Sequence, residues 1–163
     1  HCTAVRAVGS VLREYASRGL LRALVQPGSG AGMPEFRFLW FRDREFCLRI
    51  DQRAGRMRVD GVLHDVAPRS QMDRELRVWL RSRQDPALPA HRCVDARRLG
   101  VSLRNSAGNL SLSMSSLDHD WEYATRRLVH LLNELYVDVL ARPRYFDWLI
   151  ENFELDPDDP RWP

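Results

Sequence analysis

Hydrophobic positions recur with the period of a helix at the start of the chain. One stripe comprises Val5, Val8, Val11, Leu12 and Tyr15, and a second apolar group, Leu20, Leu21, Leu24 and Val25, follows Gly19. Spacings of three and four residues place such side chains on one face of an α-helix. Because proline cannot continue a helix, we expect this N-terminal helical region to end before Pro27.

The pattern changes to alternation after Pro34. Two runs have an apolar side chain at every second position, Phe36, Phe38 and Trp40 and then Phe46, Leu48 and Ile50, and a third continues through Met57 and Val59 toward Val62 and Leu63. The polar segments 42–45 and 51–55 separate these runs, and short connections of this kind are typical of hairpins. The runs therefore predict an antiparallel three-strand meander.

A helix, a hairpin and a long helix are predicted for the second half of the chain. Ser70 and Asp73 have the spacing of a capping box and open a helix of amphipathic pattern. Residues 101–104 and 110–115 alternate on either side of a turn at 105–109, and segment 94–99 is a candidate for one further short strand. Helical periodicity then extends from about residue 120 to 140, with Asp118 as the expected N-cap, and an aromatic-rich short helix follows Pro143.

The predicted order is helix, three strands, helix, two strands and helix, which is an α+β fold with helices covering one antiparallel sheet. Residues 1–153 are assigned to a single domain, and the acidic, proline-rich residues 154–163 to a mobile tail. In topology, although not in any motif, this layout resembles that of type III secretion chaperones. The resemblance implies a dimeric domain that binds an extended polypeptide along its sheet or helix flanks.

The outward face of the meander holds the residues that we consider for partner binding. Arginines alternate there with Asp51 and Asp60, and opposite charges at neighbouring cross-strand positions are typical of a solvated, mutually paired face. Apolar side chains fall on the same face, and an apolar patch of this kind needs cover from an internal helix, a second subunit or a partner. The candidate partner-binding residues are Leu39, Phe41, Cys47, Arg37 and Arg49.

Composition narrows the classes of function. All 25 basic side chains are arginines and isoleucine occurs only twice, which indicates a GC-rich bacterial genome rather than a selected basic surface. The net charge is only +3, so the sequence does not favour nucleic-acid binding, and this basic balance departs from the acidic character of type III secretion chaperones. Three widely spaced cysteines indicate a reducing cytoplasm, and no apolar stretch is long enough for a membrane span.

No catalytic or ligand-binding motif is complete. The glycine-rich segment 27–34 lacks the lysine of a phosphate loop, and no nucleophile-elbow motif surrounds the hairpin serines. His91 with Cys93 is a candidate nucleophile–base pair, although such close spacing on a loop is usually incidental. Arg126, His130, Glu134 and Asp138 recur every four residues, which a ladder of ion pairs explains without a metal. We expect neither a cofactor nor a metal.

These observations favour a non-catalytic protein-binding module, a chaperone-like or adaptor domain whose partner is another polypeptide or a second copy of the chain. The alternative is a small enzyme or a small-ligand-binding domain with a pocket between the sheet and the long C-terminal helix. A buried arginine or histidine facing such a pocket would favour the alternative.

Overall fold

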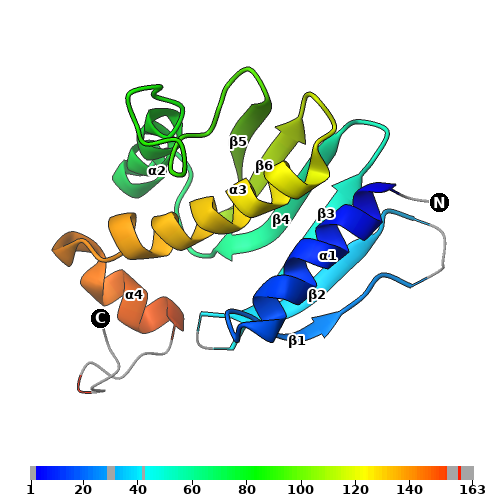
Figure 1. The fold of residues 1–163 in the computed structure, drawn as a ribbon. Helices are drawn as coiled ribbons and strands as arrows, with labels where there is room; N and C mark the ends of the chain where they lie inside the picture. The colour runs from blue at the N-terminus through cyan, green and yellow to red at the C-terminus, as the bar shows by residue number, and fades with distance from the viewer. Residues whose placement is uncertain (1–2, 29–31, 42, 154–157, 159–163) are drawn as a thin grey trace.

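Six antiparallel strands form one sheet in the order β1-β2-β3-β4-β6-β5 (Figure 1). The structure is a computed structural model that describes residues 3–28, 32–41, 43–153 and 158, except for the side chain of Phe153. The strands are β1 (Arg22–Val25), β2 (Glu35–Trp40), β3 (Arg44–Asp51), β4 (Arg56–Leu63), β5 (Leu99–Ser106) and β6 (Asn109–Ser116). The predicted α+β class, the meander (β2 to β4) and the hairpin (β5 and β6) are confirmed.

The first three of the four described helices pack on one face of this sheet, and the fourth lies beyond its end (Figure 1). They are α1 (Thr3–Ser17), α2 (Gln71–Ser82), α3 (Trp121–Glu134) and α4 (Phe146–Phe153), with a π-helical turn at Leu135–Val139 and a 3-10 turn at Pro143–Tyr145. Figure 1 shows α1 and α3 side by side across the same face, with α2 near β5. No helix among the described residues has the length and hydrophobicity that a bilayer span requires.

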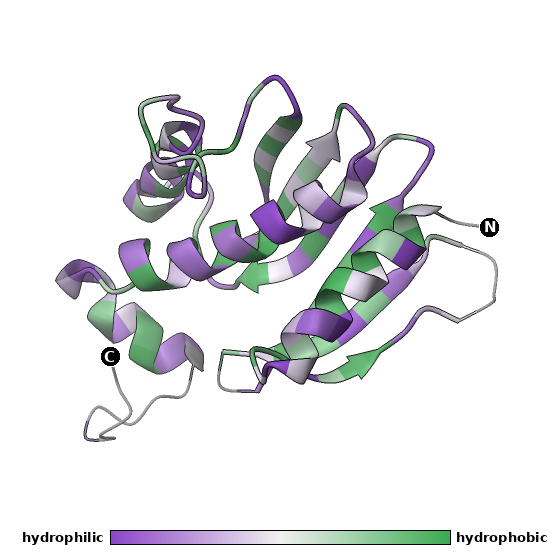
Figure 2. Cartoon of the chain, in the orientation of Figure 1, coloured by the Kyte–Doolittle hydropathy of each residue, from purple (hydrophilic) through white to green (hydrophobic). Residues whose placement is uncertain are grey.

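The core lies between the helices and the inward side chains of the strands. Alternation along each strand separates this buried set from the outward polar set, and Figure 2 shows it as alternating green and purple bands. Phe36, Phe46, Met57 and Met114 are fully buried. Because burial of one such side chain stabilises a fold by about 1.5–3 kcal/mol, this alternation is what fixes which face of the sheet carries the helices.

Both edges of the sheet are protected. At one edge, β1 is only four residues long and is irregular at Ala23, whose φ is 53°. At the other edge, α2 shields β5, since Arg77 Nη1 donates a hydrogen bond of 2.8 Å to the Leu103 carbonyl. Asn105 Nδ2 likewise donates to the Val66 carbonyl at 2.8 Å. Short strands and covering helices are common means of preventing edge-to-edge pairing.

The N-terminal prediction is corrected, because residues after Gly19 form strand β1 rather than helix. The helix ends in a Schellman motif in which Leu20 N donates to Tyr15 O at 3.0 Å and Gly19 N donates to Ala16 O at 3.0 Å. Gly19 has a φ of 76°, a left-handed conformation that glycine adopts without strain.

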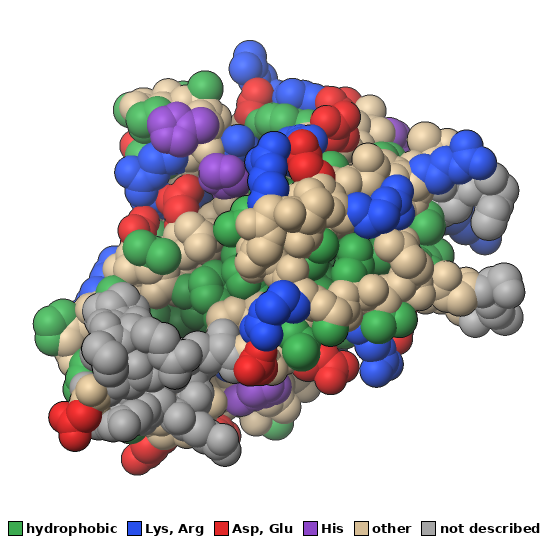
Figure 3. Space-filling view, turned by 60° about the horizontal axis from the view of Figure 1, so that its bottom comes forward, with side chains coloured by type: hydrophobic (Ala, Val, Ile, Leu, Met, Phe, Trp, Pro, Cys, Tyr) green, Lys and Arg blue, Asp and Glu red, His purple; other side chains and the backbone are tan. Residues whose placement is uncertain are grey.

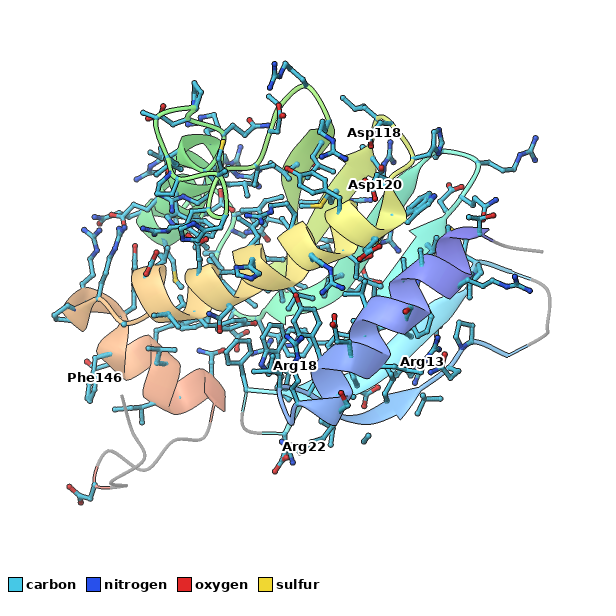
Figure 4. All side chains as sticks on the ribbon, viewed as in Figure 1. Arg13, Arg18, Arg22, Asp118, Asp120 and Phe146 are labelled. Carbon is cyan, nitrogen blue, oxygen red and sulfur yellow. The ribbon has the colours of Figure 1, made fainter. Side chains whose placement is uncertain are left out.

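The boundaries of the second and third predicted helices are now defined. Ser70 caps α2 as predicted, since its Oγ accepts a hydrogen bond of 3.2 Å from Asp73 N. The N-cap of α3 is Asp120 rather than Asp118, because the Asp120 carboxylate accepts from Tyr123 N at 3.0 Å. Asp118 and Asp120, labelled in Figure 4, both pair with Arg98, at 2.6 and 2.8 Å.

Segment 94–99 and the long C-terminal helix differ from the prediction. Segment 94–98 has no strand, and β5 begins at Leu99. The predicted long helix keeps its α-helical form only to Glu134 and then continues as the π-helical turn. The predicted mobile tail, 154–163, lies outside the described residues apart from Asp158.

Candidate interaction face

The face of the sheet opposite the helices carries the outward side chains of all six strands. Strand register places them in rows, one of which includes Ser102, Ser113, Arg58, Arg49 and Glu35. None of the described helices covers this face, and its side chains are partly or fully exposed. We therefore treat it as the candidate interaction face.

One half of the face, on β2 to β4, is occupied by a continuous chain of alternating charges. We call this set the charge chain; in order it is Arg58, Asp60, Arg49, Glu35, Arg37 and Glu45. Arg58 Nε lies 2.8 Å from Asp60 Oδ1, and Arg49 Nε lies 3.4 Å from Asp60 Oδ2 and 3.3 Å from Glu35 Oε2.

Arg37 continues the charge chain across β2. Its Nη2 lies 2.9 Å from Glu35 Oε1 and its Nη1 lies 3.5 Å from Glu45 Oε1. Hydrogen bonds from Arg37, and to a smaller extent from Cys47, hold the pKa of Glu35 below its usual range. The predicted candidates Arg37 and Arg49 therefore already have intramolecular partners, as the mixed-sign pattern had indicated.

Cys47 and Leu39 lie on this face as predicted, and both are half-buried. The Cys47 thiol donates to Glu35 Oε2 at 3.4 Å, and burial raises the pKa of the thiol. Leu39 is aligned between Arg22 of β1 and Glu45 of β3. The apolar content of the face is thus small and is enclosed by charged side chains.

Phe41 was expected on the same face, and that placement is wrong. Strand β2 ends at Trp40, and Phe41 has a φ of 48°, so the chain turns before the alternation reaches it. Its ring packs against Trp40 and Tyr136, each with a centroid separation of 4.2 Å, as part of the core. Phe41 therefore contributes to packing at the end of the sheet rather than to the candidate face.

The other half of the face, on β5 and β6, is built from small residues. We call this set the serine shelf; it comprises Gly100, Ser102, Ser111, Ser113 and Ser115. Ser111 Oγ donates to Asp60 Oδ1 at 3.2 Å, whereas the hydroxyl groups of Ser102, Ser113 and Ser115 have no hydrogen bond to any described residue. Arg56 aligns with Ser115, and Arg104 aligns with Ser111.

Arg56 and Arg104 differ from the arginines of the charge chain. Both are exposed, and neither forms an ion pair with any residue that the structure describes. Arg56 continues the alternation of β4 back from Arg58, so its outward position was readable in the sequence. The position of Arg56 beside the shelf could not be read from the sequence, because it depends on the pairing of β4 with β6.

A cavity lies away from the candidate interaction face. Segment 84–97 and Tyr123 of α3 enclose about 580 Å³, and Cys93 lines this space. The Arg98 guanidinium stacks over the ring of Tyr123, with its Cζ 3.8 Å from the ring centroid. The described residues contain no hydrogen bond between His91 and Cys93, and the His91 carbonyl accepts from Arg127. The predicted nucleophile–base pair therefore has no supporting contact.

The space between the sheet and α3 does not form the pocket that the alternative function requires. It contains about 10 Å³, roughly the volume of one water probe. Among the described residues its lining consists of aliphatic side chains and Trp79, without arginine or histidine. Packing thus closes the place where a small-ligand site was anticipated.

Two residues of the predicted four-residue repeat, Glu134 at the end of α3 and Asp138 in the π-helical turn, form ion pairs with arginines outside the repeat rather than within it. Glu134 accepts from Arg83 at 2.9 Å and from Arg92 at 3.3 Å, and Asp138 accepts from Arg92 at 3.2 Å. The described residues contain no cluster of three potential metal ligands. In Figure 3, basic and acidic side chains likewise lie beside one another rather than in patches of one sign.

These features define an α+β fold in which the described helices cover one face of the antiparallel sheet and leave the other uncovered. No protein-family model, no curated protein and no solved structure matches the chain.

Proposed function

We propose that this chain is a non-catalytic protein-binding domain that takes a polypeptide on the helix-free face of its sheet. The observation that carries the proposal is the contrast within that face. The charge chain is internally paired, whereas three hydroxyl groups of the serine shelf and the two flanking arginines have no partner among the described residues. Polar groups without intramolecular partners are available for hydrogen bonds and ion pairs with another molecule.

The size of the face suits a polypeptide. Six strands spaced about 4.8 Å apart, with up to eight residues each at about 3.3 Å, give roughly 600 Å². A typical protein interface buries about 800 Å² per partner.

A second candidate function is supported by one observation, the cavity of about 580 Å³ beside Tyr123. This volume lies within the range of small-molecule pockets, about 300–1,000 Å³. Binding of a small ligand there involves segment 84–97 rather than the sheet, so mapping the binding site separates the two candidates.

Site-specific photocrosslinking tests the proposal. A photoreactive benzoylphenylalanine is placed at Ser113 on the shelf or, as the control, at the exposed Glu122 on α3, and each protein is irradiated in a lysate of the source organism. The proposal predicts a defined polypeptide adduct, identified by peptide sequencing, from position 113 only. No adduct at position 113, or the same adducts at both positions, would overturn it.

A further inference from the structure

Charge is distributed unequally between the two halves of the candidate interaction face. The charge chain contains three arginines and three carboxylates in alternation. The shelf contains no acidic residue, and its flanking arginines, Arg56 and Arg104, have no ion pair within the described part of the chain. Arg56 is aligned with Asp51 of β3 as well as with Ser115, but the two charged side chains form no ion pair. The arginines of the face without an ion pair to a described residue therefore lie at the border of the shelf.

The two arginines are aligned with opposite ends of the shelf. Arg56 shares a row with Ser115 and Gly100, and Arg104 shares a row with Ser111, four residues along β6. That separation is about 13 Å along the strands and about 10 Å across them, or about 16 Å on the diagonal. An extended chain covers this distance in about five residues.

The shelf is low, since its side chains are hydroxymethyl groups or hydrogen, and the longer side chains of the charge chain border it on β4. Two strands span about 5 Å from backbone to backbone, which suits a single extended chain. Hydroxyl groups both donate and accept, so they can pair with either peptide group of such a chain.

From these observations we infer that the partner is an extended segment with two acidic side chains about five residues apart. The segment lies over the serine shelf, its carboxylates pair with Arg56 and Arg104, and its backbone hydrogen-bonds to the hydroxyl groups of Ser102 and Ser113. This inference rests on the proposed function and specifies the chemistry of the partner.

A nucleic acid fits these observations less well. A polynucleotide carries a phosphate at every step and is held by a continuous row of cations, with aromatic side chains that stack on its bases. The shelf has a cation only at each end and no aromatic side chain. A peptide with two separated carboxylates places one negative charge at each of the two arginines.

Fluorescence anisotropy provides the test. The probe is a labelled nine-residue serine–threonine peptide with glutamates at positions 2 and 7, compared with the same peptide carrying lysines and with a labelled oligothymidylate. We expect saturable binding of the glutamate peptide only, weakening as salt rises. The Arg56→Ala/Arg104→Ala variant should bind it at least about fivefold more weakly, since two exposed ion pairs are lost.

The matched control is Arg6→Ala/Arg81→Ala, which removes the same charge from exposed positions on the helical side. It should bind the glutamate peptide as the parent does. Equal weakening in both variants, preference for the oligothymidylate, or no binding of the glutamate peptide would overturn the inference. If a polypeptide adduct still forms at position 113, only the inference about acidic chemistry fails; if none forms, the proposed function fails as well.

Discussion

Asp73 is a buried carboxylate that joins three parts of the structure. It is 4% exposed. It accepts hydrogen bonds from Asn105 Nδ2 at 2.9 Å, from Arg77 Nε at 3.2 Å and from Arg69 N at 3.3 Å. Burial acts to raise the pKa of Asp73, but the hydrogen bonds from Asn105 and Arg77 outweigh it and hold the pKa below its ordinary value. Asp73 thus stabilises the fold as an ion.

We predict that Asp73→Asn lowers the free energy of unfolding by about 2 kcal/mol at pH 7. The carboxylate accepts all of the hydrogen bonds at this site, whereas the asparagine amide would place its own NH₂ donor next to donors that then lack an acceptor. Urea denaturation measures the change. The exposed Asp147→Asn is the control, with an expected change below about 0.5 kcal/mol. Similar values for both variants would show that the Asp73 contacts contribute little.

The same residue gives a pH dependence with a definite sign. Because the folded-state pKa is lowered, the stabilisation is complete above the unfolded-state value, about 3.9, and is lost as pH falls through the folded-state value. The stability difference between the parent and Asp73→Asn should therefore begin to narrow only when the pH falls below about 3.9. A constant difference between pH 6 and pH 3 would contradict this.

At the scale of single residues, alternation predicted the burial of most strand positions. Leu39 and Cys47 lie on the outward face as the pattern required. Phe41 does not, because the strand ends one residue earlier and the positive φ at Phe41 breaks the period of two. Periodicity does not mark the residue at which a strand stops.

At the scale of elements, helix α2 covers the edge strand β5 and shields it from pairing with another strand. We predict that Arg77→Ala lowers the free energy of unfolding by about 1–3 kcal/mol, since it removes a charged donor from the Leu103 carbonyl and from Asp73. Exposure of the edge should also increase light scattering on partial unfolding. Arg81→Ala, in the same helix and without an ion pair to any described residue, should change neither quantity. If Arg77→Ala left both the free energy of unfolding and the light scattering unchanged, α2 would not protect the β5 edge through this residue.

Some element boundaries were readable from sequence and some were not. The start of α2 was signalled by Ser70 with Asp73. The end of α1 was predicted too late, since the helical region was extended past Gly19 to Pro27. Strand β1 was not readable, because its four residues show no alternation and its place depends on pairing with β2. Both Asp118 and Asp120 are acceptable caps, and their contacts with Arg98 and Tyr123 decide between them.

At the scale of the whole molecule, strand order is what creates the candidate site. The meander and the hairpin were predicted separately, but only the pairing of β4 with β6 places Arg56 and Arg58 beside the serine rows. Apart from Phe41, which lies off the face, the predicted candidates came from one half of the face, and the charged side chains of that half are paired with one another. The unpaired half combines residues more than forty positions apart, and local sequence patterns carry no information on such pairing.

The most direct test of the account is amide chemical-shift mapping of the ¹⁵N-labelled protein on addition of the glutamate peptide. We predict that the perturbed amides are confined to β4, β5 and β6 and saturate together. Perturbations confined to α1 and α3, or to segment 84–97 around Tyr123, would contradict the claim that the helix-free face of the sheet is the binding surface.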